Sequence, residues 1–283
     1  MSKMRAQTIQ IFLPDGSPRS IRIAAFTSRI TQIILIPRNK LEDAKSRDEL
    51  QNVGVYFLFG SSDDKAKDQV YIGESENCLE RLKQHNAKKD FWNTALVVIS
   101  KTNNLTKSDV KYLEHFTYKK AKEAGRYEVE NSIIPKESLI SEWMKADLMH
   151  VFEDIKILIG TLGYPLFEEI HGASSKQEEV LICKGKEAYA TGEYTDDGFV
   201  VLKGSKANIE EVRTAGASVI NTRKKLLNSN IVEKKENVYI FKEDYIFSSP
   251  SAAAAAVLGR RANGWTEWKD NDGHTLDELK RQN

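Results

Sequence analysis

The alternation of hydrophobic and polar residues predicts a β-rich beginning of the chain. Three apolar segments carry this pattern, at Ile9–Pro14, Ser20–Phe26 and Thr31–Pro37. The first two are separated by Asp15-Gly16-Ser17-Pro18, a turn sequence, so a strand is expected on each side of it. Residues 1–50 are therefore predicted to form an N-terminal β-rich segment. It either extends the sheet that follows or packs against the C-terminal part.

Between residues 51 and 165 the hydrophobic period alternates between that of a strand and that of a helix. Strands are expected at Val53–Phe59, Gln69–Gly73 and Thr94–Ser100; helices are expected after Ser75, at Thr106–Ala124 and over most of Glu137–Leu162. A further short helix is expected just before this region, at Leu41–Gln51. From residue 53 to 124 the order is β-β-α-β-α. This order predicts an α+β fold in which a small antiparallel sheet is flanked by helices.

The C-terminal third has shorter elements and more turns. The segment 166–178 is predicted to be a linker, and 179–283 a smaller mixed α/β domain. Short strands, a helix at Asn208–Leu227 and a hairpin at Glu236–Phe247 are expected there. An alanine-rich helix follows, with Ser249 as its N-cap, proline in its first turn, and Gly259 at its end.

Composition narrows the classes of protein that the chain can belong to. Of its 283 residues 40% are hydrophobic and 29% are charged, as in globular proteins with packed cores. No run of eighteen apolar residues and no signal-peptide pattern is present, so a cytoplasmic protein without a membrane partner is expected. Cys78 and Cys183 are the only cysteines, which argues against a disulfide framework or a zinc site.

Charge is balanced overall but not locally. The net charge is +1, yet residues 75–126 contain eleven Lys or Arg against six Asp or Glu. Residues 203–236 contain eight against four. Such an excess is often only a solvated helix face, but a basic face also attracts phosphates.

Six polar side chains that could serve phosphodiester chemistry follow one another within residues 54–131: two tyrosines, an arginine, a histidine, a carboxylate and an amide. In order they are Gly54-Val55-Tyr56, Tyr71-Ile72-Gly73, Arg81, His85, Glu114 and Asn131. This series resembles the GIY-YIG nuclease family over residues 52–132. Val55 stands where the first motif of the family has isoleucine. Both are apolar residues suited to a buried position, so this difference does not affect the resemblance. Each residue alone has an ordinary structural interpretation, so the joint pattern carries the resemblance.

The periods of strand and helix support this grouping. Residues two apart on a strand share a face, so Tyr56 lies with Gly54, and Tyr71 lies with Gly73. If the two strands pair antiparallel, both phenols stand on one surface of the sheet. On the following helix Arg81 and His85 are four residues apart and therefore lie on one face.

The resemblance implies metal-assisted cleavage of a phosphodiester. Glu114 is the expected ligand of one divalent cation, Mg²⁺ or Mn²⁺, which acts as a Lewis acid. Arg81 is expected to clamp the phosphate with its forked donors. Asn131 is expected to be a polar orienting residue.

Tyr56 is implied as the general base or as a relay that activates water, assisted by Tyr71 or His85. A free tyrosine has a pKa of about 10 and is a poor base at neutral pH unless nearby positive charge lowers it. His85 titrates in a more suitable range. Which of Tyr56 and His85 takes the proton is left open by the sequence.

The C-terminal sequence carries a second resemblance. The pieces Ser-Pro-Ser-Ala-Ala-Ala and Asn-Gly-Trp, within residues 228–273, resemble a domain of unknown function that is often fused to GIY-YIG nucleases. More distantly they are similar to the RAMA domain, proposed to recognise modified DNA. The predicted DNA contacts in this region are Arg260, Arg261, Asn263 and Trp265. The alternative is that Trp265 and Trp268 fill a small core.

Two functions are weighed. The first is a metal-dependent endonuclease that hydrolyses duplex or branched DNA, with the C-terminal domain assisting DNA selection. The second is a catalytically silent nucleic-acid-binding module, such as a reader of modified DNA in defence. The complete set of motif residues favours the enzyme. The oligomeric state and the cut site are left open.

Overall fold

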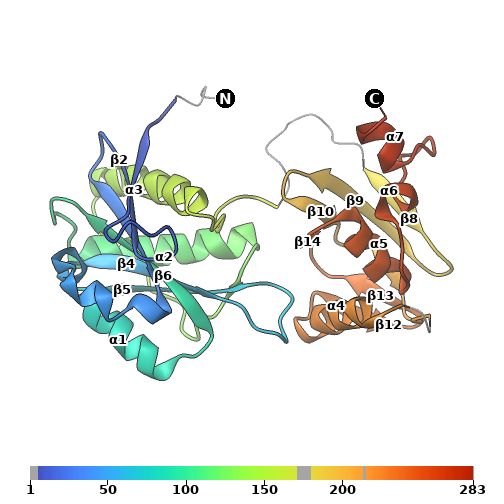
Figure 1. The fold of residues 1–283 in the computed structure, drawn as a ribbon, viewed down its shortest axis with the longest axis horizontal. Helices are drawn as coiled ribbons and strands as arrows, with labels where there is room; N and C mark the ends of the chain where they lie inside the picture. The colour runs from blue at the N-terminus through green and yellow to red at the C-terminus, as the bar shows by residue number, and fades with distance from the viewer. Residues whose placement is uncertain (1–5, 171–179, 213–214, 283) are drawn as a thin grey trace. The chain divides into compact units, whose positions relative to one another are not determined.

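The computed structural model describes residues 6–170, 180–212 and 215–282, and its contacts divide the chain into two compact units. Unit 1 comprises Met1–Ser62 and Lys67–Glu168; unit 2 comprises Asp63–Ala66 and Glu169–Asn283. Figure 1 draws the elements of both. Most of the predicted linker, from residue 171 onward, lies outside the described residues. No described helix is both long enough and apolar enough to cross a membrane.

Unit 1 is built on a seven-stranded sheet in the order β1-β2-β3-β6-β4-β5-β7. Its strands are β1 (Ile9–Phe12), β2 (Arg22–Phe26), β3 (Thr31–Pro37), β4 (Gly54–Gly60), β5 (Gln69–Ser75), β6 (Trp92–Ser100) and β7 (Glu128–Val129). All neighbours pair antiparallel except β5 and β7. Because β3 pairs with β6, the N-terminal strands extend this sheet, one of the two arrangements that the sequence left open.

Alternation along β4 divides the interior of unit 1 into two cores. Val55, Phe57 and Phe59 belong to the core that α2 (Lys107–Ala124) and α3 (Glu142–Thr161) cover. Tyr56 and Leu58 belong to the core on the other face, beneath α1 (Cys78–Lys88). Figure 1 shows α1 and α3 on opposite sides of the sheet. The unit therefore has three layers, with the sheet in the middle.

Capping residues fix where the helices of unit 1 begin. The Asn77 side chain accepts a hydrogen bond from the Glu80 amide, so α1 begins two residues later than Ser75 had suggested. Thr106 and Asp109 form a capping box that starts α2. Gly125, at φ 67°, ends α2 in a left-handed conformation that favours glycine.

The predicted helix at residues 41–51 is wrong. The chain instead forms short 3₁₀ turns at Arg38–Lys40, Asp43–Ser46 and Asp48–Gln51. Arg47 has an extended conformation between the last two, which interrupts helical hydrogen bonding. The turns bury Leu41, Ala44 and Leu50 in the α1-side core, and this burial takes the place of a continuous helix.

Unit 2 contains a second seven-stranded sheet, in the order β12-β13-β11-β9-β10-β14 with β8 paired to β9. The strands are β8 (Leu181–Lys184), β9 (Tyr189–Thr195), β10 (Gly198–Val201), β11 (Lys206–Asn208), β12 (Val232–Lys235), β13 (Val238–Phe241) and β14 (Tyr245–Phe247). The helices are α4 (Ala217–Asn228), α5 (Pro250–Leu258), α6 (Gly264–Glu267) and α7 (Leu276–Lys280).

Two sequence predictions for unit 2 need correction. The expected hairpin at 236–247 is wrong, because β13 pairs with β11 and β12 while β14 pairs with β10. The hairpin is instead β12–β13, which turns at Glu236 with φ 47°. The helix expected from Asn208 begins only at Ala217, because Asn208 is part of β11.

The alanine-rich helix α5 is confirmed. The Ser249 side chain caps the Ala252 amide, and Gly259, at φ 69°, ends the helix. Ala253–Ala256 are buried in the core of unit 2, where small side chains allow the helix to approach the sheet. Trp268 is buried too; its indole donates to the Pro250 carbonyl at 3.0 Å and its ring lies 4.3 Å from Phe199.

Candidate active site

The register of β4 and β5 places the two motif tyrosines on one face of the sheet. Tyr56 lies opposite Gly73, and Leu58 lies opposite Tyr71. The two phenol rings stack at a centroid distance of 6.3 Å and an interplanar angle of 24°. The antiparallel pairing expected from the sequence is therefore present, and it brings both phenols to the side of the sheet that α1 covers.

Gly73 allows the Tyr56 ring to lie flat across β5. A Cβ atom at Gly73 would be 2.2 Å from the Tyr56 hydroxyl and 2.4 Å from the carbon that bears it. Both distances are far below van der Waals contact, so any side chain here would displace the ring. The glycine of the second motif is thus a steric requirement for the tyrosine of the first.

The Tyr56 hydroxyl connects the two predicted residues of α1. It lies 2.8 Å from Nε2 of His85 and accepts a hydrogen bond from Nε of Arg81 at 3.2 Å. Because the guanidinium is only a donor, the hydroxyl hydrogen of Tyr56 is free to point at His85. This arrangement needs a neutral imidazole that carries its hydrogen on Nδ1. Burial raises the pKa of Tyr56, and the Arg81 hydrogen bond opposes the rise.

His85 is held neutral by its surroundings. Burial, followed by the positive charges of Arg81, Lys89 and Lys88, lowers the pKa of His85 to about 4. The Lys89 ammonium also lies 4.4 Å from the centre of the Tyr71 ring. At neutral pH the imidazole therefore accepts a proton only if added negative charge offsets these cations.

Glu114 lies on α2, the helix on the other face of the sheet. Burial, then the negative charge of Glu74, raises the pKa of Glu114 to about 7, although Lys107 and Lys111 oppose the rise. Among the described residues no ion pair neutralises the Glu114 carboxylate. Glu74 itself pairs with Lys107 at 2.8 Å. Sequence reasoning missed Glu74; its place directly after the second motif, on the α2 side of β5, was the available signal.

The open edge of β5 joins the two parts of the site. β7 pairs with Gln69 and Val70, and in the part of the chain that the structure describes no other strand lies beside the later part of β5 on that side. Asn131 occupies the next position: its side-chain oxygen accepts from the Ile72 amide at 3.0 Å, and its nitrogen donates to the Ile72 carbonyl at 2.7 Å. Asn131 therefore holds the backbone of β5. Although Glu114 lies on α2 and Tyr56 faces α1, the Glu114 charge is near enough to raise the pKa of Tyr56.

The donor set around Glu114 fits a hard divalent cation. Glu114 is a half-buried carboxylate with a raised pKa and with no ion pair to any residue that the structure describes, so its negative charge is poorly compensated. Mg²⁺ binds through one or two carboxylates and completes its shell with water and phosphate oxygens. A cation at Glu114 would supply the missing positive charge.

A second acidic group, Asp270, Asp272 and His274, lies in unit 2. Its geometry is that of a turn: Asp270 accepts from the backbone amides of Asp272 and His274 at 3.0 and 2.8 Å, and lies 2.9 Å from the His274 ring. The group needs no ion to explain its shape.

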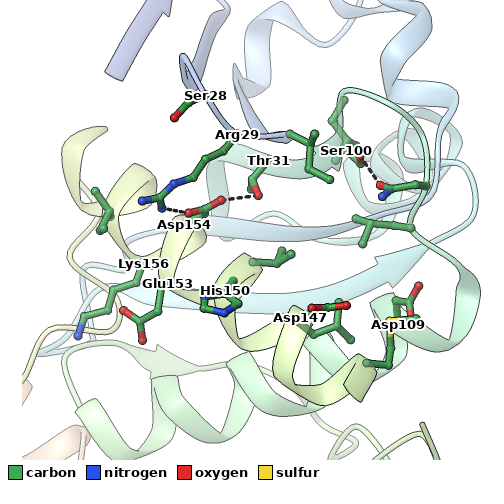
Figure 2. Close-up of a pocket in the computed structure, with 18 of the residues that line it drawn as sticks. Ser28, Arg29, Thr31, Ser100, Asp109, Asp147, His150, Glu153, Asp154 and Lys156 are labelled. Atoms are coloured by element: carbon green, nitrogen blue, oxygen red, sulfur yellow. Dashed lines mark hydrogen bonds and ion pairs between the residues drawn. The ribbon is translucent and has the colours of Figure 1, made fainter. Parts of the chain in front are cut away.

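The large cavity of unit 1 is separate from this cluster. It has a volume of about 950 Å³, lies between the β2–β3 turn, the start of α2 and α3, and is lined by none of the predicted site residues. In Figure 2, Asp154 of α3 contacts Arg29 and accepts a hydrogen bond from Thr31. Asp109, a buried residue that also lines the cavity, caps the start of α2. The contacts of Asp154 with Arg29 and Thr31 join the N-terminal strands to α3.

Most of the residues predicted to contact DNA are engaged in contacts within unit 2. Arg260 pairs with Glu267 at 2.7 Å, and Asn263 caps α6. The Trp265 ring is covered by the Arg281 guanidinium at 3.4 Å and has an edge contact with Tyr194. Arg261 is different: it is exposed, and within the described residues it has no ion pair.

Comparison with known families agrees with this geometry. Residues 52–139 match the family model of the GIY-YIG catalytic domain, a nuclease family, and residues 181–280 match that of a domain of unknown function, DUF4357. No curated protein and no solved structure matches the chain. The first match spans all six predicted site residues from Tyr56 to Asn131. The two resemblances seen in the sequence, to the nuclease family and to a domain of unknown function, are confirmed, as is the α+β fold.

Proposed function

We propose that this chain, which carries a GIY-YIG catalytic domain at residues 52–139, is a metal-dependent endonuclease that hydrolyses phosphodiester bonds in DNA. The nuclease family implies a nucleic-acid substrate. The observation that supports catalysis most strongly is the contact of one buried hydroxyl, that of Tyr56, with both Arg81 and His85. This contact lies beside a carboxylate, Glu114, that has no ion pair among the described residues.

We infer that a proton relay runs through Tyr56, with His85 as the final proton acceptor. The attacking water gives a proton to the Tyr56 oxygen while the Tyr56 hydrogen passes to Nε2 of His85, 2.8 Å away. Tyr56 then never carries a full negative charge, which its burial disfavours. His85 resists protonation because burial, and after it the charges of Arg81, Lys89 and Lys88, lowers its pKa. A bound phosphodiester brings negative charge that offsets these cations and raises the basicity of His85 when substrate is present.

Arg81 and Glu114 supply the electrostatics of the reaction. Arg81 is partly exposed and remains charged, because its hydrogen bond to Tyr56 raises its pKa further. Its guanidinium can pair with a phosphate through parallel hydrogen bonds. Glu114 would hold the divalent cation, which supplies Lewis-acid stabilisation of the phosphate and of the leaving oxygen. Asn131 keeps β5, and with it Tyr71, in register.

The DUF4357 region is proposed to assist DNA selection. Arg261 supports this because it is exposed without an ion pair among the described residues, and arginine is suited to phosphate contacts. Residues 203–236 add a local excess of basic side chains. Selectivity for modified over plain duplexes would test this part of the proposal separately from cleavage.

Cleavage assays with and without metal test the proposed function. The purified chain is incubated with supercoiled, linear, branched and single-stranded DNA, in Mg²⁺, in Mn²⁺ or in EDTA. We expect cleavage with a divalent cation and none in EDTA, because the cation held by Glu114 would supply the positive charge that stabilises the phosphate and the leaving oxygen. Tight DNA binding without cleavage of any substrate would instead support a catalytically silent binding module. Cleavage in EDTA would rule out the metal dependence.

The pH dependence of cleavage provides a second test. Glu114 has a pKa raised to about 7, so its carboxylate is increasingly protonated, and unable to hold a cation, as the pH falls through 7. At limiting Mg²⁺ we expect kcat/KM to rise from pH 5.5 to a plateau near pH 8. Higher Mg²⁺ should move the midpoint to lower pH, because metal and proton compete for one carboxylate. A midpoint independent of Mg²⁺ would argue against Glu114 as the ligand.

A further inference from the structure

Two neighbouring isoleucines are exposed in the segment after Asn131. Ile133 is 79% exposed and Ile134 is 64% exposed, and Ser132 before them is exposed too. The next residue, Pro135, is buried. Single exposed apolar residues are common on protein surfaces, but an adjacent pair beside a candidate active site requires an explanation.

The isoleucine pair lies between two anchored residues. On one side, both polar atoms of the Asn131 side chain bind the backbone of Ile72. On the other side, the Pro135 carbonyl lies 2.8 Å from Nδ1 of His115, which donates to it. The three residues between these anchors therefore form a short exposed bridge from the open edge of β5 to α2.

Both anchors are sequence neighbours of predicted catalytic residues. Ile72 lies between Tyr71 and Gly73 on β5, and His115 directly follows Glu114 on α2. Three extended residues span only about 10 Å. The isoleucine pair is thus held at the rim of the site, where the tyrosine side and the carboxylate side approach each other.

The charges around the pair identify its partner. Lys136 lies two residues after Ile134, and Lys111 lies one helical turn before Glu114, close enough that its charge opposes the rise in the Glu114 pKa; both lysines are exposed and have no ion pair among the described residues. Apolar side chains flanked by unpaired cations match a polyanion whose interior is apolar, as in nucleic acids, where phosphates surround stacked bases.

We propose that Ile133 and Ile134 form an apolar wedge that contacts the bases next to the scissile phosphate and opens their stacking. This inference rests on the proposed nuclease function. Apolar wedges partly unstack base steps at a cost that depends on the step. The wedge therefore makes the enzyme selective for steps that open easily, such as pyrimidine–purine steps, mismatches and branch points. The proposed substrate is therefore DNA that has an easily deformed base step at the cut.

The test uses the full chain with Ile133→Ser and Ile134→Ser combined. The matched control combines Ile11→Ser and Phe12→Ser, a pair 46% and 58% exposed on β1, at the far end of the sheet from β5. On an intact duplex we expect the wedge variant to lose about 10- to 100-fold in kcat/KM and the control to lose less than about 3-fold. A mismatch at the cut step should restore the wedge variant to within about 3-fold of the wild type, because the stack is already open.

Base unstacking is measured directly, in EDTA, with 2-aminopurine placed at a pyrimidine–purine step of the duplex, a probe site that does not depend on cleavage. Wild-type protein and the control should raise its fluorescence, whereas the wedge variant should not. Equal losses on intact and mismatched DNA, or unstacking by the wedge variant, would overturn the proposal. Absence of cleavage by wild type, with unstacking retained, would remove the nuclease proposal and leave the wedge. A wild-type protein that does not unstack the bases overturns the wedge, whether or not it cleaves.

Discussion

Replacement of Glu114 by glutamine is expected to abolish cleavage and to leave DNA binding in EDTA nearly unchanged. Glutamine keeps the size and burial of the side chain but removes the charge that a divalent cation needs. The raised pKa of Glu114 marks it as a carboxylate whose charge the protein compensates poorly. We expect kcat to fall by about 1,000-fold or more, since loss of the metal removes stabilisation of both phosphate and leaving group.

A control on the same helix separates this effect from general damage to α2. Glu123 lies near the end of α2, where it pairs with Lys120 on the surface, so Glu123→Gln should cleave like wild type. Mg²⁺ should also raise the melting temperature of wild type at pH 8 but not that of Glu114→Gln, a readout that does not depend on turnover. Unchanged cleavage by Glu114→Gln would place the metal elsewhere.

Replacement of Tyr56 by phenylalanine is expected to reduce kcat by about 100- to 10,000-fold, the range typical of general acid–base catalysis. Phenylalanine keeps the ring that packs over Gly73 and removes the hydroxyl that joins Arg81 to His85. The loss should appear in kcat more than in KM, because Arg81 still binds the phosphate. Single-turnover cleavage rates measure this effect directly.

Comparison with His85→Ala distinguishes a relay from direct base catalysis by Tyr56. If protons pass through Tyr56 to His85, the two single variants lose similar activity and the double variant loses little more, because both changes break one path. Additive losses would show that the two residues act independently. Tyr112→Phe, which removes the hydroxyl of a buried tyrosine of α2, is the control and should retain activity.

The motif residues were identifiable from sequence because their order resembles that of the GIY-YIG family, and local periodicity supports their grouping. The strand period places Tyr56 and Tyr71 on faces that meet once β4 and β5 pair, and the helix period places Arg81 beside His85. Caps and glycines likewise determine where α2 and α5 begin and end. These features involve residues a few positions apart, so a single sequence contains enough information to predict them.

The remaining features depend on contacts between residues distant in the sequence. β13 pairs with β11 and β12 rather than with β14. Which strands become neighbours depends on how all the strands of the sheet pack together, and not on the local sequence alone. Tertiary packing placed Glu74 close enough to Glu114 to raise its pKa, and the cations of α1 around His85. It also anchored Asn131 on Ile72, which holds the exposed isoleucine pair at the rim. The sequence by itself determined the order of the motif residues and their resemblance to the GIY-YIG family. The fold decided their burial and electrostatic surroundings, because both depend on neighbours that only tertiary packing brings together.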